Sequence, residues 1–163
     1  MSKVYVQIPE ALTFDLADPG SGEPMFVHDQ VGSYPEGPIM MIREPREPAV
    51  GTFAGCVRAL FVDPRVAEGI SDGYELMGAR HALTRAEPGD IVELSTDVHR
   101  VLRDCILKPH AGFSKAWLWS GGLDLLRCIV DATTAHPKKV EAQVHGANGR
   151  RQMASERRAA AKG

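Results

Sequence analysis

The hydrophobic and polar positions of this chain change their period near residue 52. Before that point, short segments alternate between apolar and polar residues, which is the period of a β-strand. Lys3–Ile8 and Thr13–Ala17 are rich in β-forming residues and predict two strands, which a turn at Pro9 joins into a hairpin. Residues 25–28 predict a third short strand. We therefore expect a small β element over residues 1–28.

Prolines and glycines break this pattern between residues 29 and 50. They exclude a long helix or a central strand there, because proline has no amide hydrogen to donate. One apolar run interrupts the segment, Ile39-Met40-Met41-Ile42, which can dock as an edge segment. Loops of this length are usually functional or mobile. We interpret residues 29–50 as an exposed, proline-rich arm or a linker, with Met40 and Met41 as candidate partner-binding residues.

After residue 52 the apolar residues recur every three or four positions, which is typical of amphipathic helices. Thr52 is placed to cap a first helix that ends at Asp63-Pro64, because the residue before a proline disfavours helical backbone. Ser71 is placed to cap a second helix, which ends before the turn at Pro88. Two apolar faces predict that this helix is flanked on both sides: Tyr74, Met77 and His81 on one, and Leu76, Ala79 and Leu83 on the other.

A short strand and two further helices complete the predicted helical core, residues 51–136. Ile91–Leu94 predicts the strand, and Thr96-Asp97 is placed to cap a helix that runs to Leu107. The last helix is predicted over Leu123–Thr133. The apolar stripe of the helix before it is Val98, Val101, Leu102, Cys105 and Ile106.

The charge of the chain is distributed unevenly. Residues 137–163 hold seven basic and two acidic residues, whereas the preceding residues hold 12 basic and 19 acidic ones. The net charges of the two parts are therefore +5 and −7. No apolar periodicity remains after Pro137, so we expect a flexible basic tail there, and an arm of this kind is a signal for interaction. The predicted fold class is α+β: a small N-terminal β-hairpin element, a proline-rich arm, a mainly helical core with one short strand, and the tail.

The titratable residues do not assemble into a recognisable catalytic or metal-binding pattern. Zinc needs four ligands, or three and an open position, and the pairs Cys105 with His110 and Cys128 with His136 are too loose to supply them. His99 falls on the polar side of its helix, where solvent is expected to surround it. No serine lies in a nucleophile elbow, and no glycine-rich phosphate loop is present. We expect no enzymatic activity, no metal and no cofactor.

The cysteines and the lengths of the apolar runs indicate the cellular compartment of the protein. The chain has three cysteines, and each lies inside an apolar helical pattern: Cys56, Cys105 and Cys128. An odd number of cysteines in such positions indicates buried thiols in a reducing environment. No apolar run approaches the roughly 20 residues that span a bilayer, and the N-terminus has no apolar signal segment. The expected location is the cytoplasm.

Two tryptophans form a second set of candidate partner-binding residues. Trp117 and Trp119 are two positions apart, so they cannot share one face of a helix. One is expected to fill the core and the other to meet a loop or a partner, since tryptophan is enriched at binding hot spots.

Two segments carry a resemblance to a known family. Thr52-Phe-Ala-Gly-Cys-Val-Arg-Ala-Leu-Phe-Val-Asp-Pro64 and the segment Asp90–Pro109 resemble the tail assembly chaperones of tailed phages in their order of helix, Asp-Pro stop, short strand, acidic cap and proline-closed helix. The similarity covers about half of the chain. The proline-rich segment 32–48 and the Trp117/Trp119 pair depart from the family pattern.

The resemblance implies a holding function in virion assembly. A tail assembly chaperone binds the long tape-measure protein and recruits tail-tube subunits in the host cytoplasm, and many are also made as a longer, frameshifted product. Two other functions stay open. The tail arginines can neutralise nucleic-acid phosphates, and the arm can make this protein a self-associating structural subunit of a virion or assembly. The arginines concerned are Arg150, Arg151, Arg157 and Arg158.

Overall fold

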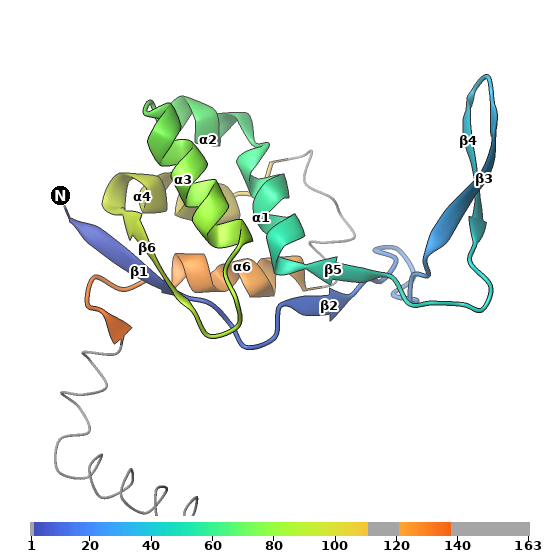
Figure 1. Cartoon of the computed structure of the whole chain (residues 1–163), viewed down its shortest axis with the longest axis horizontal. Coiled ribbons are helices and arrows are strands. Elements are labelled where there is room, and N and C mark those ends of the chain that lie inside the picture. Colours follow the sequence, from blue (N-terminus) through green and yellow to red (C-terminus); the bar gives the residue numbers. More distant parts are fainter. Residues whose placement is uncertain (1, 111–120, 138–163) are drawn as a thin grey trace, which may run out of the picture.

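The protein consists of a helical body and a narrow β arm that extends away from it (Figure 1). A computed structural model describes residues 2–110 and 121–137. Helices and strands together confirm the α+β class that the sequence predicts. Trp117, Trp119 and the predicted basic tail after Pro137 lie outside the described residues.

One antiparallel sheet closes a side of the body. Strand β1 (Lys3–Gln7) pairs with β6 (Ile91–Ser95), so that Val4 lies opposite Leu94 and Val6 opposite Val92. These four side chains are buried and their neighbours along each strand are not, which is the alternation of a sheet with one face on the core. On the other edge of β1, Tyr5 exchanges backbone hydrogen bonds of 2.8 and 3.1 Å with Thr133.

The predicted N-terminal hairpin is wrong. Strand β2 (Thr13–Asp15) exists, but it pairs with β5 (Val50–Thr52), and β1 pairs with β6. The two N-terminal strands therefore belong to different sheets. Burial of Val4, Val6 and Ile8 under the helices favours the distant partner, because that pairing adds Val92 and Leu94 to the same apolar face.

Five helices are described, and local signals set their ends. Thr52 caps α1 (Phe53–Phe61) by accepting a hydrogen bond from the Gly55 amide at 3.0 Å, as the sequence predicts. Pro64 opens the short helix α2 (Pro64–Gly69), a position where its missing amide hydrogen costs nothing. The other helices are α3 (Gly73–Thr84), α4 (Thr96–Leu107) and α6 (Gly122–Val130).

Two predicted caps are displaced by one residue. Asp72, not Ser71, caps α3 by accepting from the Tyr74 amide at 2.9 Å. Ser95, not Thr96-Asp97, caps α4. The last helix also ends earlier than predicted, because Thr133 leaves it to bond with Tyr5 of β1.

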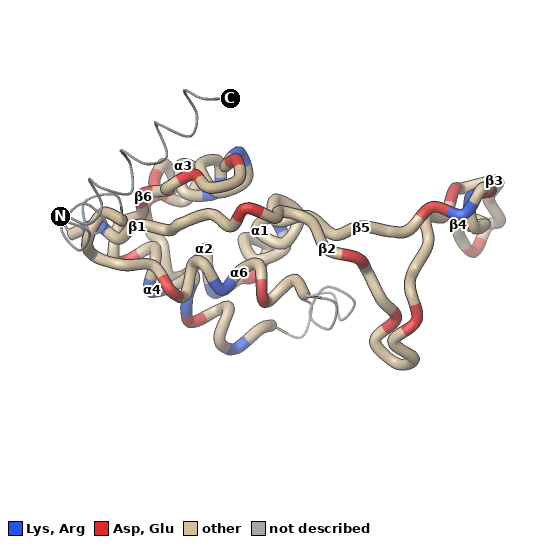
Figure 2. The backbone as a smooth tube through the Cα atoms, turned by 90° about the horizontal axis from the view of Figure 1, so that it is seen from below, with Lys and Arg blue, Asp and Glu red and all other residues tan. Residues whose placement is uncertain are grey.

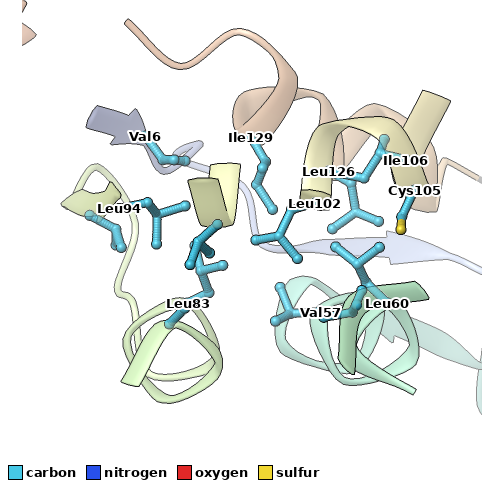
Figure 3. Close-up of a cluster of buried hydrophobic side chains, with 14 of the residues drawn as sticks. Val6, Val57, Leu60, Leu83, Leu94, Leu102, Cys105, Ile106, Leu126 and Ile129 are labelled. Carbon is cyan, nitrogen blue, oxygen red and sulfur yellow. The ribbon is translucent and has the colours of Figure 1, made fainter. Parts of the chain in front are cut away.

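The hydrophobic core lies where the helices meet the sheet. Figure 3 shows side chains of α1, α3, α4, α6 and both strands converging on one space. Four of the five predicted stripe residues of α4 are buried, and the fifth, Val101, packs against them. The fully buried side chains include Val6, Phe53, Val57, Leu60, Leu83, Leu102, Leu126 and Ile129.

Two predictions about helix faces are wrong. Tyr74 of α3 is 94% exposed and Met77 is 57% exposed, so α3 packs through one face and not through two. His99 is buried, and its Nε2 lies 2.8 Å from the Ile129 carbonyl oxygen, which joins α4 to α6. An imidazole with a backbone partner is satisfied inside the core, and a single-helix pattern cannot show that partner.

The three cysteines are free thiols. Burial raises the pKa of Cys56 to about 12 and that of Cys128 to about 11, and it also raises the pKa of Cys105. Since the thiolate is the reactive form, all three are poor nucleophiles at neutral pH.

Asp63 makes the stability of the body depend on pH. Its carboxylate is buried and accepts from the Arg65 amide at 3.0 Å and from Arg65 Nη2 at 2.6 Å, while the same Nη2 donates to the Lys108 carbonyl at 2.6 Å. The side-chain hydrogen bonds from Arg65 hold the pKa of Asp63 below its ordinary value. The carboxylate therefore stabilises the fold above a pH of about 4, and this contribution is lost as pH falls through the lowered pKa.

We expect Asp63→Asn to reduce this acid sensitivity. Asparagine keeps a capping oxygen but does not titrate. Urea unfolding at pH 7 and pH 3 should show a larger loss of unfolding free energy for the native protein than for the variant. Equal losses in the two proteins would contradict the assignment.

Candidate protein-binding arm

The arm, residues 13–52, leaves the body and returns to it at one place (Figure 2). Strands β2 and β5 form its base, and backbone bonds join residues 16–18, 23–27 and 47–49 in its middle. Its outer part is the hairpin of β3 (His28–Tyr34) and β4 (Gly37–Ile42). Where the arm meets α1, the Phe53 amide donates to the Leu12 carbonyl at 2.8 Å, so the two ends of the arm touch.

The sequence predicts an exposed arm but not this hairpin. Pro35 follows the last residue of β3, and Gly37, which begins β4, has a positive φ of 147°. Proline at the second position of a turn and glycine at the fourth are typical β-turn residues, so Tyr34-Pro35-Glu36-Gly37 is the signal that would have located the hairpin. The prolines exclude a central strand, and they are compatible with a two-stranded ribbon in which each strand is an edge.

Polar contacts hold the base of the hairpin to the returning strand. Arg43 Nη2 and Nε donate to the Asp29 carboxylate at 2.7 and 2.9 Å, and its Nη1 donates to Glu47 at 2.7 Å. Hydrogen bonds from Arg43 lower the pKa of Asp29. Beside this cluster, the Arg46 guanidinium lies 5.4 Å from the centre of the Phe26 ring. These contacts are exposed to solvent, so they orient the hairpin without supplying a core.

No apolar core supports the arm. Residues 13–50 are all described, and none of them is buried. Six of the ten exposed large hydrophobic residues in the described part of the chain belong to the arm. A two-stranded hairpin without a core is marginally stable in water, and grouped exposed apolar residues indicate an interaction surface. The six residues are Val31, Tyr34, Met40, Met41, Ile42 and Val50.

The structure places the predicted residues Met40 and Met41 on the outer hairpin. They are 49% and 58% exposed, and they point to opposite faces of β4 because successive side chains of a strand alternate. Val31 interrupts the pairing register of β3, where a bulge leaves it 58% exposed. Both faces of the hairpin therefore present apolar side chains, and sequence reasoning missed Val31 and Tyr34.

A single aromatic residue fixes the arm to the body. Phe14 of β2 packs against the hydrophobic core, and its ring covers Gly51 of β5. Gly51 is buried, and a Cβ atom built on it would lie 2.3 Å from Phe14 Cζ. The close approach of the two strands therefore requires glycine at this position.

The arm is acidic. Residues 13–50 contain seven acidic and two basic residues, a net charge of −5, and the acidic residues follow its whole length (Figure 2). A surface complementary to the arm would combine apolar side chains with basic ones around them.

Other kinds of site have less support in the described residues. Among residues 2–110 and 121–137, no group of three or more His, Cys, Asp and Glu side chains is arranged to hold a metal ion. Within the same ranges, no helix has both the length and the apolar character needed to cross a membrane. The candidate residues Trp117, Trp119, Arg150, Arg151, Arg157 and Arg158 lie outside the described residues.

No family model, curated protein or solved structure matches this chain. Its function is therefore inferred from its residues and their arrangement.

Proposed function

We propose that this protein is a non-enzymatic assembly factor that binds a partner protein through the outer hairpin of the arm. The observation that supports the proposal is the exposure of large apolar side chains along residues 13–50, of which none is buried; five of these six side chains lie on the outer hairpin. Burial of such side chains by a partner supplies the apolar contacts that the arm lacks on its own.

Two modes of binding suit the hairpin. Neither β3 nor β4 pairs with another described strand along its outer edge, so a partner can add a strand there through backbone hydrogen bonds. The alternating side chains of β4 can enter apolar pockets on either side of the ribbon. Neither mode involves a chemical reaction, as expected of a protein that only holds its client.

The resemblance to phage tail assembly chaperones supplies the candidate clients. In that setting, the arm would hold a tape-measure or tail-tube protein until assembly. The same arm supports a second function, a structural virion or assembly subunit, when its partner is another copy of this chain. Nucleic-acid binding through the basic tail stays a prediction, since its arginines lie outside the described residues.

The double substitution Met40→Asp and Met41→Asp tests the proposal. It places a charge on each face of the hairpin and should weaken partner binding more than about tenfold, because each methionine loses the free energy of burying an apolar side chain. Co-expression with a tape-measure or tube protein, followed by affinity purification and mass spectrometry, measures recovery of the client. Light scattering of the purified protein measures self-association.

The matched control is Leu107→Asp, which places the same charge on an apolar side chain of similar exposure on the body. Leu107 is 62% exposed and Met41 is 58% exposed. The control should keep the client or the oligomer, and both variants should keep the melting temperature because neither site is in the core. Equal recovery from the arm variant and the native protein, with an unchanged mass in light scattering, would exclude the arm as the binding surface.

A further inference from the structure

A cationic pocket lies on the body, between α1 and α3. Its volume is about 270 Å³, and α3 supplies most of its wall. Arg58 comes from α1, and Arg85 directly follows α3. None of its lining residues belongs to the arm: they are Arg58, Met77, Arg80, His81, Thr84 and Arg85.

The described arginines that form no ion pair with a carboxylate all lie in this pocket. Nine arginines lie in the described part of the chain, and six of them form an ion pair with an aspartate or glutamate. The three described arginines that form none are Arg58, Arg80 and Arg85, and all three line this pocket. If the arginines were scattered at random over the surface, the three without an ion pair would not be expected to line the same pocket.

Helix geometry fixes these side chains on one face. Residues three, four and seven apart lie on the same side of a helix, so Met77, His81 and Thr84 form one row with Arg80 beside it. Thr84 Oγ1 donates to the Arg80 carbonyl at 2.8 Å, and the Arg85 amide donates to the His81 carbonyl at 3.1 Å. These bonds lie in the last turn of α3, and the second one holds Arg85 at the C-cap of the helix.

The helix dipole accounts for only part of this charge. Basic residues near the C-terminal end of a helix offset a partial negative charge of about half a unit. The pocket holds three full guanidinium charges, and none of the three forms an ion pair with a carboxylate of the described residues. A net positive charge therefore remains for a ligand.

We propose that this pocket binds a phosphoryl group. Guanidinium groups donate paired, planar hydrogen bonds that fit phosphate oxygens, and a phosphate has enough oxygens and charge to engage more than one guanidinium at once. A single carboxylate is matched by one arginine. The volume is at the small end for ligand sites, so it suits a phosphoryl group with a short attachment and not a whole dinucleotide.

Two sources can present that group: a small phosphorylated molecule, or the backbone of a nucleic acid. The described residues that line the pocket belong to the body, and none of them belongs to the arm. A failure of the protein-binding proposal would leave this one untouched, because the two use separate residues and separate probes.

The experiment uses the full chain and three probes. Calorimetry measures the binding of inorganic phosphate and of pyrophosphate, and fluorescence anisotropy measures the binding of a labelled single-stranded oligonucleotide. The pocket variant is Arg58→Gln with Arg80→Gln. The control is Arg100→Gln with Arg103→Gln, which removes two arginines from α4 that form ion pairs outside the pocket.

We expect the native protein to bind pyrophosphate saturably, and the pocket variant to bind it at least about tenfold more weakly, since hydrogen bonds to charged groups are worth that factor or more. The control should lose less than about twofold, because its two arginines lie outside the pocket and act on the ligand only through a field that salt screens. A parallel loss of oligonucleotide binding in the pocket variant alone would identify nucleic acid as the source. Its retention would identify a small phosphorylated ligand.

Three outcomes would overturn the proposal. One is the absence of saturable binding for all three probes. Another is an equal loss in the pocket variant and the control, which would show a dependence on net charge alone. The third is competition by a polyglutamate peptide as effective as that of pyrophosphate, which would assign the pocket to carboxylates. Glutamine keeps the size of the side chain, and an unchanged melting temperature confirms that each variant is folded.

Discussion

Replacing Leu102 with alanine should lower the free energy of unfolding by about 2 to 5 kcal/mol. Leu102 lies on α4, has no exposed surface, and sits among the core side chains of α1 and α6 (Figure 3). The substitution removes apolar atoms and leaves a cavity that the surrounding helices only partly fill. Urea unfolding followed by circular dichroism measures the difference.

Leu107→Ala is the matched control for this prediction. Leu107 lies on the same helix but is 62% exposed, so the same change should alter stability by no more than about 0.5 kcal/mol. Similar losses at Leu102 and Leu107 would mean that α4 packs through a different face from the one described.

A second pair of substitutions adds one methyl group at two glycines, with opposite expected results. Gly51→Ala should destabilise the protein by about 1 to 3 kcal/mol, because the new Cβ atom would force the Phe14 ring out of its place. Gly78→Ala should stabilise it by about 0.5 to 1 kcal/mol, since Gly78 lies inside α3 with no atom within 4 Å of an added Cβ. Thermal and urea unfolding measure both changes.

The Gly51 variant should also loosen the attachment of the arm. Phe14 joins the base of the arm to the core, so its displacement should increase the rate at which a protease cuts residues 13–52. If Gly51→Ala keeps native stability and native resistance to proteolysis, the ring does not cover Gly51 as described.

Local sequence signals predicted some helix ends, although the caps of α3 and α4 are displaced by one residue and α6 ends early. The Thr52 cap, the stop at Asp63-Pro64 and the apolar stripe of α4 each depend on a few adjacent residues, and each is found in the structure. The α+β class followed from the change of hydrophobic period. These features are properties of a segment, so one sequence is enough to show them.

Features that depend on distant residues were not predictable in the same way. The alternation of Lys3–Ile8 shows that one face is buried but does not identify β6 as the partner strand. His99 looked solvent-exposed on its own helix, and its partner is the carbonyl of Ile129, thirty residues later. The face with Tyr74 and Met77 is apolar enough for a core position, yet no described element covers it.

The candidate site was predicted in outline. Met40 and Met41 were recognised from their apolar run, while the aromatic and β-branched residues across the hairpin were not. The cationic pocket was not predicted from the sequence. Its arginines lie on α1 and along the end of α3, and only the structure shows that they lie together and form no ion pairs.

The hydrogen bond between Phe53 and Leu12 has a consequence for how this protein can change. Because of this bond, residues 13–52 form a loop whose two ends are held together at the body. The entropic cost of closing such a loop changes only slowly with its length. Insertions, deletions and surface substitutions in the outer hairpin are therefore expected to have little effect on the stability of the helical body. Selection can therefore change the exposed surface of the outer hairpin while the core residues of the helical body stay the same.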